Sequence, residues 1–169
     1  MARTSARDNK NVFWQAREAM GLSREAASEL LETIPPERIE RIETEKFMPH
    51  PDEVLLMAEK YKVSTLCNYY CSQQCPIGQQ YVPEIKIKDL SQIVLEMLAS
   101  LNFMQRQTTR LIDIAADGVI DNDELKDFVN IQKELERISI TVETLQLWSE
   151  QMLANGKINM ERYNALTGK

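Results

Sequence analysis

The sequence predicts an all-helical protein, and three observations lead to this fold class. Gly and Pro are scarce, with 5 and 6 copies among 169 residues, whereas sandwiches and barrels need many turns. Hydrophobic residues recur at steps of three and four along most of the chain, which is the period of an amphipathic helix. Helix caps and breakers divide this pattern into five short segments, two long ones and a short last one.

The first two helices are expected over residues 11–20, ending at Gly21, and over residues 24–31. Ser23 is the expected N-cap of the second helix, because a serine hydroxyl accepts a hydrogen bond from a free backbone N–H of the first turn. The inward residues of this second helix are Ala27, Leu30 and Leu31.

Two pairs of prolines mark the next helices. Pro35 and Pro36 open the third, which runs to about Thr44, since proline is tolerated in a first helical turn. Ile39 and Ile42 are its inward residues. Pro49 and Pro51 frame the start of the fourth helix, and a fifth begins at Ser64. The inward face expected for the fourth helix consists of Val54, Leu55, Met57, Ala58 and Tyr61.

The second half of the chain has a different pattern. Apolar residues from Leu90 to Ala115 predict one long amphipathic helix, and those from Leu125 to Leu153 predict a second. A short helix is expected from Asn159. Long helices joined by a short turn fold back as an antiparallel hairpin.

These elements suggest three regions: a helical domain at 1–75, a linker at 76–87 and a helical hairpin at 88–169. A lone hairpin cannot cover both of its apolar faces. We therefore expect it to pair with a second copy in a four-helix bundle, which makes the protein a homodimer. The alternative is that the hairpin packs onto its own N-terminal domain.

Charge and cysteine content limit the function classes. The net charge is −6, and both the part before Pro83 (10 basic, 12 acidic) and the part after it (10 basic, 14 acidic) are acidic. This argues against strong non-specific binding to nucleic acids. We find no signal peptide or membrane span, and three cysteines do not suit a disulfide framework. A cytoplasmic location is expected.

Ser28 is a small residue where two of these helices would cross, Ile34 is an apolar residue in the turn between them, and residues 41–43 form an Arg-Ile-Glu run. These positions, between Gly21 and Pro49, resemble the motif of the Xre/Cro helix-turn-helix family. The resemblance covers about residues 11–66. It implies a five-helix lambda-repressor-like domain. The predicted fold of the whole chain is therefore all-α, with this domain followed by a long antiparallel helical hairpin.

The resemblance also implies double-stranded DNA as a partner, because the second helix of the motif lies in the major groove. Arg38 and Arg41 would pair with guanine, and Glu37 or Glu40 would accept from cytosine. Lys46 and the N-terminal arginines would contact phosphates. The DNA-binding residues carried over from the family are Arg24, Pro36, Glu37, Arg38, Glu40, Arg41 and Lys46, with Pro35 at the edge of the set.

Three departures from the family pattern support a second hypothesis. The turn at residues 32–34 is one residue longer than usual, and Glu45 stands where the family typically has glycine. Acids and prolines also occupy exposed positions of the recognition segment, where acids repel phosphates. The alternative to a dimeric, sequence-specific regulator is a helix-turn-helix-derived interaction or adaptor module that does not bind DNA.

Cys67, Cys71 and Cys75 follow one another at four-residue steps, and His50 is the only histidine. A chain end that folds back could bring them together around zinc or another thiolate-bound metal, or give a redox-responsive switch. On one continuous helix, however, Cys67 and Cys75 lie ~12 Å apart, too far to share one metal. The alternative is three partly buried thiols without a ligand. No other cofactor is expected.

Residues 113–124 fit several positions of a calcium-binding loop, but Ala115 occupies a ligand position. The preferred interpretation is a helix stop at Gly118 and a cap at Asp121, with Glu124 completing a capping box. No nucleophile–base pair or glycine-rich phosphate loop is present in the sequence. We therefore expect no catalytic activity.

Overall fold

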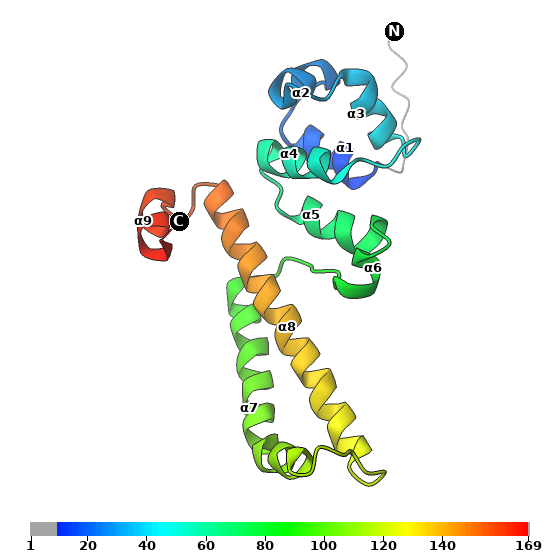
Figure 1. The fold of residues 1–169 in the computed structure, drawn as a ribbon. Coiled ribbons are helices and arrows are strands. Elements are labelled where there is room, and N and C mark those ends of the chain that lie inside the picture. The colour runs from blue at the N-terminus through cyan, green and yellow to red at the C-terminus, as the bar shows by residue number, and fades with distance from the viewer. Residues whose placement is uncertain (1–9, 169) are drawn as a thin grey trace. The chain divides into compact units, whose positions relative to one another are not determined.

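The computed structural model describes residues 10–168, and every regular element within them is helical (Figure 1). The chain divides into two compact units. Unit 1 contains the chain up to Glu84 together with the segment from Glu150 onward, and unit 2 contains residues 85–149.

Five short helices begin unit 1, as the sequence predicts. Their boundaries agree with the predicted ones to within one or two residues, because caps and prolines fix most of them. They are α1 (Val12–Ala19), α2 (Arg24–Leu31), α3 (Pro36–Glu43), α4 (Pro51–Tyr61) and α5 (Thr65–Tyr69).

Two side-chain caps define where α1 and α2 begin. The Ser23 hydroxyl accepts a hydrogen bond from the backbone N–H of Ala26 at 3.2 Å, which confirms the predicted cap of α2. The Asn11 side chain accepts from the N–H of Trp14 at 3.0 Å and caps α1. The amide of Asn11 also donates to the carbonyl of Ile42 at 2.8 Å, so the same residue ties α1 to the end of α3.

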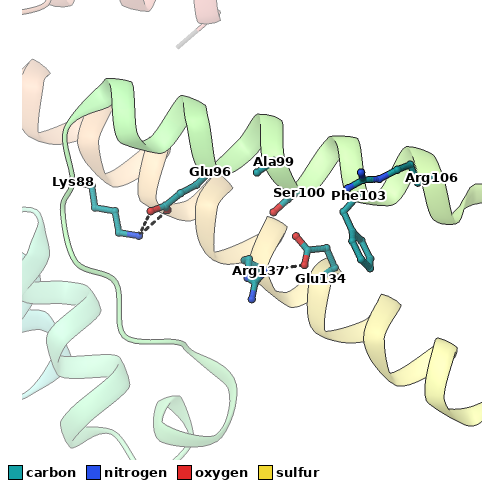
Figure 2. Close-up of a pocket in the computed structure, with 8 residues that line it drawn as sticks. All are labelled: Lys88, Glu96, Ala99, Ser100, Phe103, Arg106, Glu134 and Arg137. Carbon is teal, nitrogen blue, oxygen red and sulfur yellow. Dashed lines mark hydrogen bonds and ion pairs between the residues drawn. The ribbon is translucent and has the colours of Figure 1, made fainter.

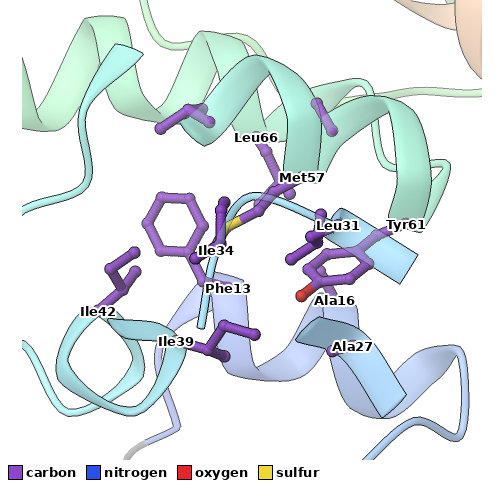
Figure 3. Close-up of a cluster of buried hydrophobic side chains, with 12 residues drawn as sticks. Phe13, Ala16, Ala27, Leu31, Ile34, Ile39, Ile42, Met57, Tyr61 and Leu66 are labelled. Carbon is purple, nitrogen blue, oxygen red and sulfur yellow. The ribbon is translucent and has the colours of Figure 1, made fainter. Parts of the chain in front are cut away.

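The core of unit 1 lies among these helices (Figure 3). Leu55 was predicted to face inward, but its side chain is 63% exposed. The buried positions of α4 repeat at three- and four-residue steps, and Leu55 lies one residue off that stripe. The prediction for Leu55 was therefore wrong. The largest buried side chains of the core are Phe13, Leu31, Ile39, Ile42, Met57, Tyr61 and Leu66.

Helix α5 continues into a π-helix over Tyr70–Gln74, which is followed by the short α6 (Gly78–Tyr81) inside the segment expected to be a linker. Gly78 is buried against the backbone of the π-helix. A Cβ atom at this position would lie 2.0 Å from the carbonyl oxygen of Cys71, so only glycine fits there.

Unit 2 is an antiparallel pair formed by α7 (Leu90–Ala115) and α8 (Leu125–Ala154), whose last turn belongs to unit 1 (Figure 1). Gly118 lies in the turn after α7 and has a positive φ of 73°. The Glu124 carboxylate accepts from the N–H of Asp121 at 3.3 Å. The glycine stop and this half of the predicted capping box are present, but α8 begins at Leu125, four residues after the predicted cap Asp121.

The α7–α8 pair buries a mixture of apolar and polar side chains. Ile93, Ile114 and Ile131 are buried, but so are Ser100 and Glu134. Several apolar residues of the amphipathic pattern predicted for α7 are about half exposed, because a different edge of the helix packs against α8. The exposed apolar residues of the predicted stripes are Leu90, Val94, Leu98 and Leu101 on α7, and Leu125, Leu135 and Val142 on α8.

The last helix of unit 1, α9 (Met160–Thr167), follows a turn at Gly156. Asn159 caps it by accepting from the N–H of Arg162 at 2.8 Å, at the position predicted. Among the described residues, no helix combines the length and apolarity needed to cross a membrane.

Candidate nucleic-acid interface

The α2–turn–α3 segment is held in place by its buried side. Ile39 and Ile42 are each 1% exposed, so the opposite edge of α3 faces outward. The Ser28 hydroxyl donates to the carbonyl of Ile34 at 2.8 Å, which fixes the turn between the two helices. Glu32 has a φ of 59° and absorbs the sharp change of direction after α2.

The outward edge of α3 carries three of the predicted DNA-binding residues. Glu37, Glu40 and Arg41 are exposed, and Lys46 is exposed in the turn just after the helix. Pro36 occupies the first helical position and is half-buried. These residues share one surface, as a helix entering a groove requires.

Arg38 does not belong to this free edge. Its Nε donates to Glu53 Oε1 at 2.7 Å, and its Nη2 donates to Glu53 Oε2 at 2.6 Å and to the carbonyl of Met48 at 3.0 Å. Burial pushes the pKa of Glu53 upward, but hydrogen bonds from Arg38 and from the N–H of His50 outweigh it, so this pKa lies below its ordinary value. The guanidinium of Arg38 is used to join α3 to α4.

Arg24 is also engaged inside the domain. Its Nε donates to Glu43 Oε2 at 2.8 Å, and its guanidinium stacks 5.1 Å from the ring of Trp14. Glu43 is buried and also pairs with Arg17, whose Nη2 lies 3.0 Å from Oε2. The hydrogen bond with Glu43 raises the pKa of Arg17. Two arginines therefore neutralise one buried carboxylate.

Arg41 remains available for a partner. No hydrogen bond or ion pair joins its guanidinium to another side chain in the part of the chain that the structure describes. The guanidinium lies 5.4 Å from the ring centroid of Phe47, whose side chain is itself exposed. Stacking uses only the flat face of a guanidinium, so the N–H groups at its edge stay free to donate.

The charge of this surface is mixed. Its exposed members are Glu37, Glu40, Arg41, Glu45 and Lys46, which are three carboxylates and two cations. Phosphates attract cations and repel unpaired carboxylates. Among the described residues, the surface therefore offers few phosphate contacts. Arg3 and Arg7, which we expected to add such contacts, lie outside the described residues.

The predicted metal ligands are distributed over several elements. Cys67 lies on α5, Cys71 in the π-helix and Cys75 at its end, whereas His50 precedes α4. Within residues 10–168, no three His, Cys, Asp or Glu side chains converge as metal ligands would. All three thiols are free and half-buried. Burial raises the pKa of the Cys67 thiol, which favours its protonated form.

Sequence reasoning missed the acids that engage the predicted arginines. Glu43 belongs to the Arg-Ile-Glu run, but the pattern did not show that it is buried between Arg17 and Arg24. Glu53 lies in the first turn of α4, where an acid is usually explained by the helix dipole. Glu43 lies 26 residues from Arg17, and Glu53 lies 15 residues from Arg38. No local sequence pattern predicts pairs that are this far apart along the chain.

In the comparison with protein families, a helix-turn-helix family model matches residues 15–66. The matched segment begins within α1 and ends within α5, so it includes the whole candidate interface. Comparison with curated proteins found no match, and neither did comparison with solved structures.

Proposed function

We propose that this chain, whose N-terminal domain is a DNA-binding helix-turn-helix domain of the Xre/Cro type, is a transcriptional regulator that binds a specific DNA site as a homodimer. The match over residues 15–66 is the observation that supports this proposal most strongly. The outward edge of α3 is the surface that such domains insert into the major groove.

Within this surface, Arg41 is the residue we assign to base recognition. Its guanidinium edge is free, and its stacking on Phe47 limits its motion. A guanidinium held in this way suits the two acceptors of guanine in the major groove. Lys46 is assigned to a phosphate, while Arg24 and Arg38 position the helices through Glu43 and Glu53.

The homodimer is proposed from the surface of unit 2. Apolar side chains on its two helices are between 39% and 51% exposed, while Ser100, Glu134 and two threonines are buried in the α7–α8 contact. Burying the exposed set would be favourable, because free energy falls by roughly 25 cal/mol for each Å² of apolar surface removed from water. A second copy offers the same apolar set. This set consists of Leu90, Val94, Leu98 and Leu101 on α7, with Leu135 and Val142 on α8.

The DNA-binding part is tested by selecting random duplexes on the full chain at about 0.1 M salt, where charge interactions are only partly screened. Enrichment of a two-fold symmetric sequence is expected. Arg41→Ala should abolish enrichment at one position of each half-site, whereas Arg162→Ala, an exposed arginine on α9, should leave it unchanged. Folded wild-type protein without any enriched sequence would contradict sequence-specific binding.

The dimer is tested by sedimentation of the same protein. Leu98→Glu on α7 and Leu135→Glu on α8 should each shift the protein toward the monomer. Leu55→Glu on α4 is the matched control, since it adds the same charge at a leucine that is also exposed. A wild type that is monomeric at every concentration would exclude the dimer but leave DNA recognition by a single domain intact.

A second candidate function follows from the composition of the α3 surface. Its acids outnumber its bases, and Phe47 and Met48 beside it are 55% and 56% exposed. Such a surface suits a protein partner that carries basic and apolar side chains. The random-duplex selection separates the two functions, because an interaction module would be folded and yet enrich no DNA sequence.

A further inference from the structure

A cavity of about 540 Å³ lies between α7 and α8 (Figure 2). Its volume falls in the range of small-molecule sites, which is roughly 300–1,000 Å³. The lining residues all lie between Lys88 and Arg137, so unit 2 forms the cavity alone. The helix-turn-helix residues belong to unit 1 and do not line this cavity.

Ser100 provides the first sign of a ligand. It is 1% exposed, and among the described residues its hydroxyl oxygen has no hydrogen-bond partner. The side chain projects from α7 toward Glu134 on α8, across the cavity (Figure 2). A buried hydroxyl without a partner is unfavourable, and a ligand that supplies one would remove this cost.

Glu134 provides the second sign. It is 8% exposed, and its Oε2 accepts a hydrogen bond from Arg137 Nη1 at 3.0 Å. Because the Arg137 side chain is 71% exposed, solvent weakens this pair. The carboxylate therefore keeps accepting capacity on the cavity side. Together with the Ser100 oxygen, it forms a set of acceptors that a protonated amine would satisfy.

Two other basic side chains line the cavity, and they differ in whether they have an ion-pair partner. Lys88 is engaged with Glu96, its Nζ lying 2.9 Å and 2.7 Å from the two carboxylate oxygens. Arg106 also lines the cavity, but no ion pair includes it in the portion of the chain that the structure describes. Its guanidinium is thus free to bind a carboxylate through two parallel hydrogen bonds.

The cavity also has an apolar wall, formed by Phe103 and Ala99 on α7 (Figure 2). We infer that this cavity binds a small zwitterion of the amino-acid class. Its ammonium group is held by Glu134 and Ser100, and its carboxylate by Arg106. Its carbon side chain packs against Phe103.

The test uses the full chain and the twenty proteinogenic L-amino acids, each added separately and detected by ligand-observed NMR. Calorimetry then gives the affinity of the strongest binder. At least one amino acid is expected to bind. Glu134→Gln and Arg106→Gln should each weaken it at least about tenfold, as the loss of a hydrogen bond to a charged group predicts. Glu136→Gln, an exposed acid on α8, and Arg162→Gln are the matched controls.

Two analogues of the strongest binder test the two charged contacts separately. The amine without the carboxylate and the acid without the amine should each bind at least about tenfold more weakly than the zwitterion. Circular dichroism verifies that each variant is folded; Arg106 is exposed, so its variant serves even if Glu134→Gln unfolds. The inference is overturned if no amino acid binds with a Kd below about 10 mM. It is also overturned if either variant binds the amino acid as well as the wild type does, or if either analogue binds as well as the zwitterion.

Discussion

Arg38 and Glu53 form a bidentate ion pair that joins α3 to α4, with Nε 2.7 Å from Oε1 and Nη2 2.6 Å from Oε2. The pair is largely shielded from solvent, since the two side chains are 19% and 14% exposed. Arg38, which the family resemblance assigns to base recognition, therefore holds the recognition helix α3 against α4.

The first prediction concerns the stability that this pair provides. Arg38→Ala and Glu53→Ala should each lower the free energy of unfolding by about 2 kcal/mol, because each leaves a partly buried charge without its partner. The double variant should lose less than the sum of the two, with a coupling of about 1 kcal/mol or more. Urea unfolding of the four proteins measures the coupling.

Arg41→Ala is the matched control for this cycle. Its side chain is exposed and has no ion pair among the described residues, so its removal should change stability by no more than about 0.5 kcal/mol. Additive losses in the Arg38 and Glu53 variants would show that the two side chains are not coupled in solution. Arg38 would then be free to contact DNA.

The second prediction is a pH dependence of the same pair. The pKa of Glu53 is lowered in the folded protein by Arg38 and by the N–H of His50, against the opposing effect of burial. The carboxylate therefore stabilises the fold fully above its unfolded pKa, about 4.3, and this contribution is lost as the pH falls through the lower folded value. The unfolding free energy of wild type minus that of Glu53→Gln should be largest near neutral pH and shrink in acid. A difference that grows in acid would contradict the assignment.

The order and the ends of the short helices were predictable because they depend on local chemistry. Ser23 and Asn159 are caps whose partners lie three residues away, and Pro36 suits the first helical position. Such signals act within one turn of helix, and the structure confirms them.

The engagement of the arginines was not predictable in the same way. Whether Arg24 and Arg38 face a partner or the protein depends on Glu43 and Glu53, which lie 19 and 15 residues away and meet them only after folding. The edge of α7 that packs against α8 was not predictable from the sequence either. Apolar residues occur on more than one edge of that helix, and spacing alone does not say which edge meets α8. The exposure of Leu90 and the burial of Ser100 are findings of the structure.

The third prediction concerns Tyr61, which is buried in the core of unit 1. Its hydroxyl has no hydrogen-bond partner among the described residues. Burial and the negative charge of Glu43 raise its pKa to about 12. Because the unfolded pKa is about 10, ionisation favours the unfolded state, and stability is lost as the pH rises from there toward the folded value.

Tyr61→Phe should therefore be at least as stable as the wild type at pH 7, since no hydrogen bond is lost. Above about pH 10 it should be the more stable of the two, because it cannot ionise. Thermal unfolding at pH 7 and in alkali provides the comparison. Tyr81→Phe, at a tyrosine that is 77% exposed, is the control and should show no such divergence. A Tyr61→Phe protein that loses stability at both pH values would indicate a hydrogen bond that the structure lacks.

The fourth prediction concerns Glu45, in the turn after α3. Its φ is 58°, in the left-handed region, which costs a residue with a Cβ atom roughly 1 kcal/mol and glycine almost nothing. Glu45→Gly should raise the unfolding free energy by up to about 1 kcal/mol, less the extra freedom of glycine in the unfolded chain. The same change also removes a carboxylate from the α3 surface.

Glu45→Gln separates the two effects, because it removes the charge and keeps the Cβ atom. Both variants should bind a duplex more tightly than the wild type by the same factor at low salt, where repulsion from phosphates is least screened. Only Glu45→Gly should be more stable. If Glu45→Gln gains as much stability, repulsion among Glu37, Glu40 and Glu45 rather than the backbone would explain the gain. If neither variant binds DNA more tightly, the α3 surface does not lie near phosphates, and the interaction module becomes the better account of the domain.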